Sequence, residues 1–260
     1  MKFTFGIVTS VGEEPLSRVR NIVESISNME IPNSLYEIVV VGGKELRGKN
    51  LVHIPFDESV KKAWITRKKN IITETARFEN IVYSHDYVSY DKDWYRGYID
   101  FGNDFDVCMN KIINFDGSRF ADYCLDAMLD IENVFGDIKN QKLVDYDLIE
   151  KVDLTKIMYI SGAYWVAKRE FMKKHPLDER LCWGEEEDVV WSHEARQHTT
   201  FRFNHMSTSK LNKNKKMGYQ LLSNRTKNIL STISPEQLGL LNIYTSSRGR
   251  DLHDFLKEAE

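Results

Sequence analysis

The stretch that decides the fold is Phe3-Thr4-Phe5-Gly6-Ile7-Val8-Thr9, close to the beginning of a chain of 260 residues. It is short, apolar and rich in β-branched and aromatic residues, which predicts a strand buried on both faces. A turn into a helix follows, because Pro15 suits the first helical turn and Glu13 and Glu14 favour its positive end. The chain therefore begins with a strand and a helix.

This pattern continues to about residue 83. Apolar runs predict three more strands and helical spacing predicts two helices: strands at Tyr36 to Val41, Leu51 to Ile54 and Asn80 to Tyr83, helices at Leu16 to Met29 and Val60 to Ala76. The alternation predicts an α/β fold with a mostly parallel central sheet flanked by helices. Ligands of such sheets bind beyond the C-terminal ends of the strands. We therefore expect the site at Thr9 to Glu13, Gly42 to Glu45 and Ser84 to Tyr90.

The second half of the sequence is less regular. Alternation predicts a strand at Phe105 to Met109, and Lys156 to Lys168 is typical of an extended run or a pair of strands. Phe120 to Ile131 fits a helix and a strand equally well. An amphipathic helix is expected at Leu252 to Ala259.

The composition is that of a folded globular protein. Hydrophobic residues make up 42% of the chain and aromatic residues 12%, and the net charge is only -3, which argues against intrinsic disorder. No apolar run approaches the ~20 residues that cross a bilayer, and the N-terminus lacks the pattern of a secretion signal. The three cysteines are too scattered for a disulfide framework or a zinc site. These features predict a cytoplasmic protein.

One segment differs from the rest of the chain in charge. Between Ala195 and Pro235 there are basic but no acidic residues, while the remainder is acidic overall. A basic segment on an acidic body predicts a local anion site, and a phosphate group is the expected ligand. A solvated loop is the simpler alternative. A nucleic-acid partner is not expected, because the acidic body would oppose it.

Three motifs carry residues suited to chemistry, and the first is Ser84-His85-Asp86 at the end of a predicted strand. Hard divalent cations such as Mg²⁺ and Mn²⁺ take oxygen ligands, and Mn²⁺ also accepts imidazole. Asp86 is the obvious carboxylate for such an ion. Taken alone, the motif is explained as well by a turn, where aspartate is common.

The second motif is a run of four acids, Glu185 to Asp188, between Trp183 and Trp191. A helix start alone favours carboxylates by a few tenths to about 1 kcal/mol. The bulky aromatic flanks argue for more, because tryptophan beside a carboxylate suits a sugar-binding pocket. Desolvation there raises the pKa of a carboxylate toward that of a useful base.

The third motif is the short run Phe201 to His205, which leads into a lysine-rich segment that ends at Lys216. A single histidine after a strand is more often structural than a ligand. Here it precedes lysines, which act as mobile point charges on phosphate. The combination is what a metal-bound diphosphate would need.

These three motifs, in this order, resemble the GT-A fold glycosyltransferases. The likeness is greatest to family 2-like enzymes and to the galactosyltransferase group with a Trp-Gly-x-x-Glu-Asp signature, and the Trp183-Gly184…Glu187-Asp188 stretch carries most of it. It covers about Lys2 to Lys216. The resemblance implies a GT-A domain at residues 1–230 with a small acceptor-side sheet, and a helical tail at residues 231–260 packed on that domain.

The resemblance also implies roles for individual residues. Asp86 and His205 would hold Mn²⁺ or Mg²⁺, and Asp188 would act as general base, with Glu187 as the runner-up. The donor, expected to be a UDP-sugar, would be contacted by Thr9, Glu13, Arg67, Asn70, His85, Lys210 and Lys213. The implied reaction transfers a sugar to a hydroxyl group of a glycan or another acceptor. One base opposite the leaving group implies inversion.

The sequence departs from the family's pattern at two places. Gly42-Gly43 stands where many family 2 members carry an aspartate that contacts the nucleotide, and Ser84 replaces the first aspartate of Asp-x-Asp. The second departure leaves a metal with fewer carboxylates and makes His205 more important. An inactive relative that binds a nucleotide-sugar or a glycan therefore stays open, as do contact with a membrane surface and the oligomeric state. A sugar nucleotidyltransferase is less favoured, because only one glycine follows the first strand.

Overall fold

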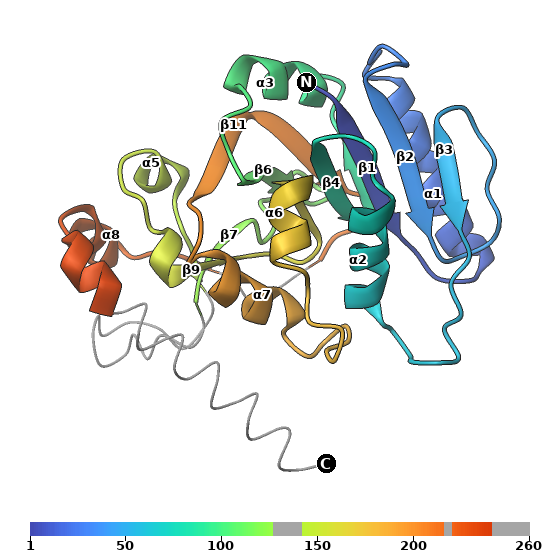
Figure 1. Cartoon of the computed structure of the whole chain (residues 1–260). Coiled ribbons are helices and arrows are strands. Elements are labelled where there is room, and N and C mark those ends of the chain that lie inside the picture. The colour runs from blue at the N-terminus through green and yellow to red at the C-terminus, as the bar shows by residue number, and fades with distance from the viewer. Residues whose placement is uncertain (127–141, 216–219, 241–260) are drawn as a thin grey trace. The chain divides into compact units, whose positions relative to one another are not determined.

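The computed structural model describes residues 1–126, 142–215 and 220–240 (Figure 1). The chain divides into two compact units, each made of three stretches of sequence. The first unit comprises Met1–Phe120, Gly162–Glu187 and Phe201–Lys215, and the second comprises Ala121–Ser161, Asp188–Thr200 and Lys216–Glu260.

The first unit is built on an eight-stranded sheet in the order β3-β2-β1-β4-β10-β6-β11-β5. The first four strands in this order are mutually parallel, as predicted, whereas β10 and β5 run antiparallel to their neighbours. The strand bounds are β1 (Phe3–Val8), β2 (Tyr36–Val41), β3 (Leu51–Ile54), β4 (Asn80–His85), β5 (Val88–Tyr90), β6 (Val107–Ile113), β10 (Tyr164–Lys168) and β11 (Phe201–Leu211).

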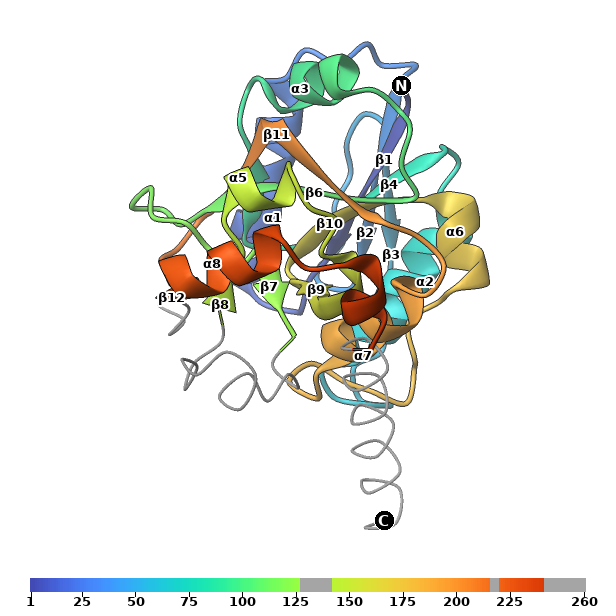
Figure 2. The same cartoon turned by 90° about the vertical axis from the view of Figure 1, so that its left-hand side faces the viewer.

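Helices cover both faces of β1. Gly6 faces α2, where a Cβ atom would come within 2.4 Å of the Ile72 side chain, so that only glycine allows this close packing. The neighbouring Phe5 points to the opposite face, where its ring lies 5.4 Å from that of Trp94 in α3. The short helix α6 lies beside α2 (Figures 1 and 2). The helices of this unit are α1 (Glu13–Ser27), α2 (Ile65–Thr75), α3 (Trp94–Phe101) and α6 (Arg169–Lys174).

The second unit contains a smaller four-stranded sheet in the order β12-β8-β7-β9. Its strands are β7 (Tyr123–Leu125), β8 (Lys142–Leu143), β9 (Met158–Ile160) and β12 (Gln220–Leu221). Its helices are α5 (Tyr146–Ile149), the 3-10 turn Thr155–Ile157, α7 (Glu187–Ala195), whose first residue belongs to the first unit, and α8 (Asn224–Ser231). A fully buried ion pair joins Arg196 to Asp126 at 2.7 Å.

The structure settles part of what the sequence left open. The segment predicted as either helix or strand contains the strand β7, and the rest of it, from residue 127, lies outside the described residues. The helix expected at Leu252 to Ala259 also lies outside them, so the boundary expected near residue 230 stays a prediction. Among the described residues, no helix has the length and apolarity needed to cross a bilayer.

Candidate functional site

The candidate site lies where β1, β2 and β4 end side by side. Thr9, Gly42 and Asp86 are the residues that follow these three parallel strands. Main-chain hydrogen bonds continue the sheet to this edge: the Thr9 N–H donates to Val41 (3.1 Å) and the Asp86 N–H to Val8 (3.2 Å). The C-terminal edge of a parallel sheet is where ligands bind in open α/β folds. Thr9, Gly42 and Asp86 belong to the three segments in which the sequence places the site, so all three segments meet at this edge.

A hollow opens beside this edge. Gly42 and Gly43 both have positive φ, and a Cβ atom at Gly42 would lie 2.5 Å from the Thr9 carbonyl oxygen. Only glycine fits such a turn, because the left-handed conformation and the close approach both exclude a side chain. The hollow is shallow and open to solvent, and it is lined by Leu16 and Val19 of α1 together with Thr9, Ser10, Gly43 and Lys44.

The Asp86 carboxylate is held by three donors on both of its oxygens. The Thr9 hydroxyl donates to Oδ2 at 2.8 Å. Arg18 donates through Nη2 to Oδ2 at 2.9 Å and through Nε to Oδ1 at 3.3 Å, a two-point contact of the kind that arginine makes with carboxylates. The Asp86 side chain is 9% exposed and that of Arg18 is 21% exposed. The pair is therefore shielded but still in reach of a ligand at the strand ends.

Two lysines from the segment after β11 lie over Tyr87, the residue next to Asp86. The Asn212 N–H donates to the Tyr87 carbonyl at 2.8 Å, which brings this segment back to the end of β4. Lys215 donates to the Tyr87 hydroxyl at 2.5 Å, and the Nζ of Lys213 lies 4.8 Å from the ring centroid. Burial and the charge of Lys213 lower the pKa of Lys215 to about 8, against the opposing effect of Asp86.

His85 lies in the same positive surroundings. Burial lowers the pKa of its imidazole well below the usual value, and the charges of Lys69 and Lys215 act in the same direction. A hydrogen bond to the Gly162 main chain opposes them. Lys69 itself donates to the Gly162 carbonyl at 2.9 Å. His85 is therefore neutral near pH 7, and the strand ends present a cationic environment.

Other residues that the sequence placed at the donor have different tasks. Arg67 pairs with Glu74 (2.7 Å) and Glu179 (3.1 Å), and the buried side chain of Asn70 bonds to Leu177 and Glu179. These contacts fasten the segment around residues 177–181 to α2. Both side chains are engaged in these contacts, and the expectation that Arg67 or Asn70 faces the donor stays a prediction.

Glu13 and Lys210 are also paired on the surface. Glu13, at the start of α1, forms an ion pair with Lys44 on the rim of the hollow. Lys210 pairs with Asp91 at 3.0 Å, beside β5. Of the two lysines predicted to bind the donor, the structure therefore brings Lys213 and not Lys210 to Asp86.

The acidic run begins in a tight loop. Gly184 and Glu186 both have positive φ, and the Cys182 N–H donates to the Glu185 carboxylate at 2.6 Å. Trp183 precedes this turn with its side chain 64% exposed, which leaves it available to a ligand. Trp191, the other aromatic flank, is buried in the core instead. Only one of the two tryptophans therefore fits the sugar-binding role inferred from the sequence.

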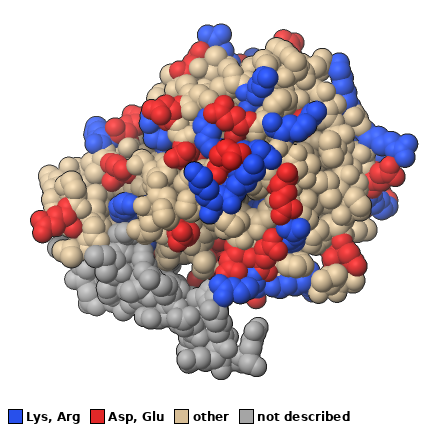
Figure 3. All heavy atoms as spheres, in the orientation of Figure 1, with Lys and Arg blue, Asp and Glu red and all other residues tan. Residues whose placement is uncertain are grey.

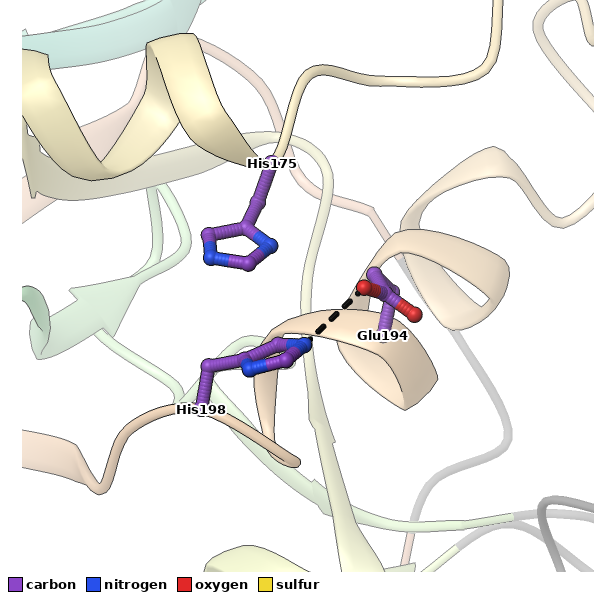
Figure 4. Close-up of side chains that lie close together, drawn as sticks. All are labelled: His175, Glu194 and His198. Atoms are coloured by element: carbon purple, nitrogen blue, oxygen red, sulfur yellow. Dashed lines mark hydrogen bonds and ion pairs between the residues drawn. The ribbon is translucent and has the colours of Figure 1, made fainter.

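The predicted bases lie at the start of α7. Glu187 is buried, whereas Asp188 is partly exposed and accepts a hydrogen bond from the Val189 N–H at 3.0 Å. At the other end of α7, His198 pairs with Glu194 at 3.1 Å, as Figure 4 shows. The greater exposure of Asp188 makes it the better placed of the two predicted bases for taking a proton from a bound hydroxyl.

Solved structures show what this architecture resembles. S. aureus TarS 1-349 matches with a TM-score of 0.52 and 13% identity over 94% of this chain and 70% of that one, and its complex with UDP-GlcNAc with a TM-score of 0.57 and 12% identity over 93% and 70%. GalNAc-T7 with UDP, GalNAc and Mn²⁺ matches with a TM-score of 0.60 and 13% identity over 85% of this chain and 45% of that one. The chain has the GT-A glycosyltransferase fold. No family model and no curated protein sequence matches it.

A metal ion, which the GT-A resemblance implies, does not fit the residues found at this edge. The expected second ligand, His205, is exposed in the middle of β11, next to the register shift between Asn204 and Thr208. The part of β11 that returns towards Asp86 is its far end, Ser209 to Leu211, which pairs with β5. Both Asp86 oxygens are occupied by Arg18 and Thr9. Within the described ranges, Asp86 belongs to no cluster of three or more His, Cys, Asp or Glu side chains with ligand spacing.

The sequence analysis missed one cation of this site, Arg18, and did not single out another, Lys215, from its neighbours. Arg18 follows Glu14 by one helical turn and looks like half of an ordinary surface ion pair, which it also forms. Its second partner, Asp86, is 68 residues away, so only the fold reveals the contact. Lys215 was one of several lysines in the basic segment, and nothing in the local pattern separates it from Lys210.

Proposed function

We propose that this chain is a glycosyltransferase that moves a sugar from a UDP-sugar to an acceptor hydroxyl group. The observation that carries the proposal is the junction of a hollow with a cationic cluster at the ends of β1, β2 and β4. A nucleoside diphosphate has the matching chemistry, because its flat ring can lie against the apolar lining and its two negative phosphates are attracted by the cations. The TarS and GalNAc-T7 structures with the same fold contain UDP or UDP-GlcNAc, which supports UDP as the nucleotide.

The donor's base would occupy the hollow. Leu16 and Val19 offer apolar contact to one side of a ring, and Thr9 and Ser10 offer main-chain polar groups at its edge. Gly42 and Gly43 let the main chain of this turn pack closely against Thr9 and Lys68, which a larger residue would displace. The phosphates would then point toward Arg18, Lys213 and Lys215.

The transfer would be a single displacement at the anomeric carbon. The acceptor oxygen forms a bond to that carbon, the bond from the carbon to the diphosphate oxygen breaks, and its electron pair leaves with UDP. The acceptor's proton passes to the Asp188 carboxylate, with Glu187 as the second candidate. Attack opposite the leaving group inverts the configuration. A positioned base of this kind contributes a factor of about 10² to 10⁴ in rate, and the exposed Trp183 offers a face for the acceptor sugar.

The first test is a thermal-shift screen of UDP, GDP, CDP and TDP, followed by an assay of UDP release from UDP-sugars. A nucleotide at 100 times its Kd should stabilise the protein by about 2.7 kcal/mol. If no nucleotide shifts the unfolding temperature, with or without Mn²⁺, the proposed function is wrong. Stabilisation without any transfer or UDP release indicates a binding protein instead.

The second test concerns the base. Asp188→Asn should lower turnover by about 10² to 10⁴ while UDP binding stays the same, because the base acts only on the acceptor. Glu186→Gln is the matched control in the same acidic run, since that side chain is exposed. Unchanged turnover in Asp188→Asn excludes Asp188 as the base, and the same measurement on Glu187→Gln then tests the second candidate.

A further inference from the structure

The Asp86 carboxylate contacts an arginine, whereas the corresponding carboxylate of a metal-dependent site contacts a metal ion. Arg18 contacts both carboxylate oxygens, and the Thr9 hydroxyl donates to one of them. A divalent cation that binds a carboxylate needs free oxygen lone pairs and takes about six ligands. Here the carboxylate of Asp86 is occupied by donors from its own fold.

The charges around Asp86 also oppose a cation. Arg18, Lys213 and Lys215 bring three positive charges to this edge against the single carboxylate of Asp86 and the exposed Glu14. A divalent cation placed here would be repelled by these three side chains. A diphosphate would instead be attracted by all of them.

These observations lead to one inference, which rests on the proposed function. We propose that the donor diphosphate is bound by Arg18, Lys213 and Lys215 without a divalent metal ion. Lys213 and Lys215 come from one segment, which is anchored at Tyr87 by Asn212, and Arg18 comes from α1. The cluster therefore approaches the strand ends from two sides, as a clamp around two phosphates requires.

In this arrangement Asp86 is a positioning residue. Its carboxylate orients the Arg18 guanidinium, and the Thr9 hydroxyl fixes the carboxylate in turn. Arginine is suited to this task because its planar fork has five N–H donors. Asp86 accepts from Nε and Nη2 and the exposed Glu14 from Nη1, which leaves one N–H on each terminal nitrogen for phosphate.

The experiment compares UDP with uridine by calorimetric titration, in EDTA and with Mn²⁺, on protein whose metal content has been measured. We expect the UDP affinity in EDTA and in Mn²⁺ to agree within about twofold. Lys215→Ala and Lys213→Ala should each weaken UDP in EDTA by about five- to tenfold and leave uridine unchanged, since uridine has no phosphate. Lys92→Ala, an exposed lysine of the same unit, is the control and should change neither ligand.

Asp86→Asn separates the two accounts. If Asp86 held a metal, wild-type UDP affinity would rise at least tenfold with Mn²⁺ and this rise would vanish in Asp86→Asn. That result overturns the inference and leaves the proposed function intact. In the arrangement proposed here, the ratio of affinities with and without Mn²⁺ stays near one in both proteins. Failure of UDP to bind under either condition overturns the inference and the proposed function together.

Discussion

The two units each contain a carboxylate paired with an arginine, but in opposite surroundings. In the second unit, Asp126 and Arg196 are both fully buried, and His193 also contacts Asp126. In the first unit, Asp86 and Arg18 keep 9% and 21% of their side chains exposed, beside a hollow and two lysines. The buried pair of Asp126 and Arg196 leaves no room for a ligand, whereas the pair of Asp86 and Arg18 lies beside the hollow. The same chemical pair thus serves the core in one unit and, in our account, an anion in the other.

The largest expected effect is on the stability that the buried pair of Asp126 and Arg196 provides. Asp126→Asn leaves the Arg196 charge buried without its carboxylate, which should cost about 3–5 kcal/mol of unfolding free energy. Urea unfolding followed by circular dichroism measures this. Asp147→Asn, an exposed aspartate of the same unit, is the control and should stay within about 0.5 kcal/mol of the wild type. A loss no larger than in the control would mean that the Asp126 pair is not structural.

At the partly exposed pair of Asp86 and Arg18, we expect a smaller effect on stability and a larger effect on UDP binding. Arg18→Met should cost about 1 kcal/mol or less of stability, because the pair is partly solvated, and should weaken UDP about tenfold, which corresponds to about 1.4 kcal/mol. Arg20→Met, an exposed arginine of the same helix, serves as control. Full UDP affinity in Arg18→Met would remove the distinction between the two pairs, because both would then be structural only.

The sequence predicts the strands and helices that carry the site, but it does not predict the ion pairs within the site. The periodic segments at Phe3–Thr9 and Leu16–Met29 predicted β1 and α1 within a few residues, because burial on a sheet imposes a regular apolar pattern. The aromatic residues Trp94, Tyr98 and Trp165 lie fully buried in the core, where large apolar side chains are common. The eventual partners of Asp86 were not predictable, since ion pairs between distant segments leave no periodic signal.

The prediction for His205 rested on a strand that ends at this residue. In the structure β11 continues to Leu211, and the residue that reaches the Tyr87 carbonyl, beside Asp86, is Asn212. Where a long strand meets its distant partners depends on long-range packing, and local patterns do not encode it.

The smallest expected effect is the pH dependence of UDP affinity, which we attribute to Lys215. Burial, with Lys213, lowers the pKa of Lys215 to about 8, whereas Asp86 opposes the shift. Because a diphosphate prefers the protonated amine, UDP affinity should fall severalfold as the pH rises through the pKa of Lys215, from about pH 7 to 9.5. Lys215→Arg should flatten this fall. Titrations of UDP at several pH values measure it, and a fall of equal size in Lys215→Arg would assign it to another group.

The same shift has the opposite sign for the stability of the free protein. The folded-state pKa of Lys215 lies below the unfolded value, so the unfolded chain binds more protons between pH 8 and 10.5 and the contribution of Lys215 to stability rises over this range. Affinity and stability should therefore change in opposite directions above pH 8. On the face that Figure 3 draws, basic and acidic side chains are interspersed.

The central claim is that the ends of β1, β2 and β4 bind a nucleoside diphosphate through protein cations. A crystal structure of the complex with UDP, grown in EDTA, tests it most directly. The account predicts the base in the hollow beside Thr9 and Gly43 and both phosphates within hydrogen-bond distance of Arg18, Lys213 or Lys215. UDP bound elsewhere in the first unit, or with its phosphates turned away from these three side chains, would contradict it.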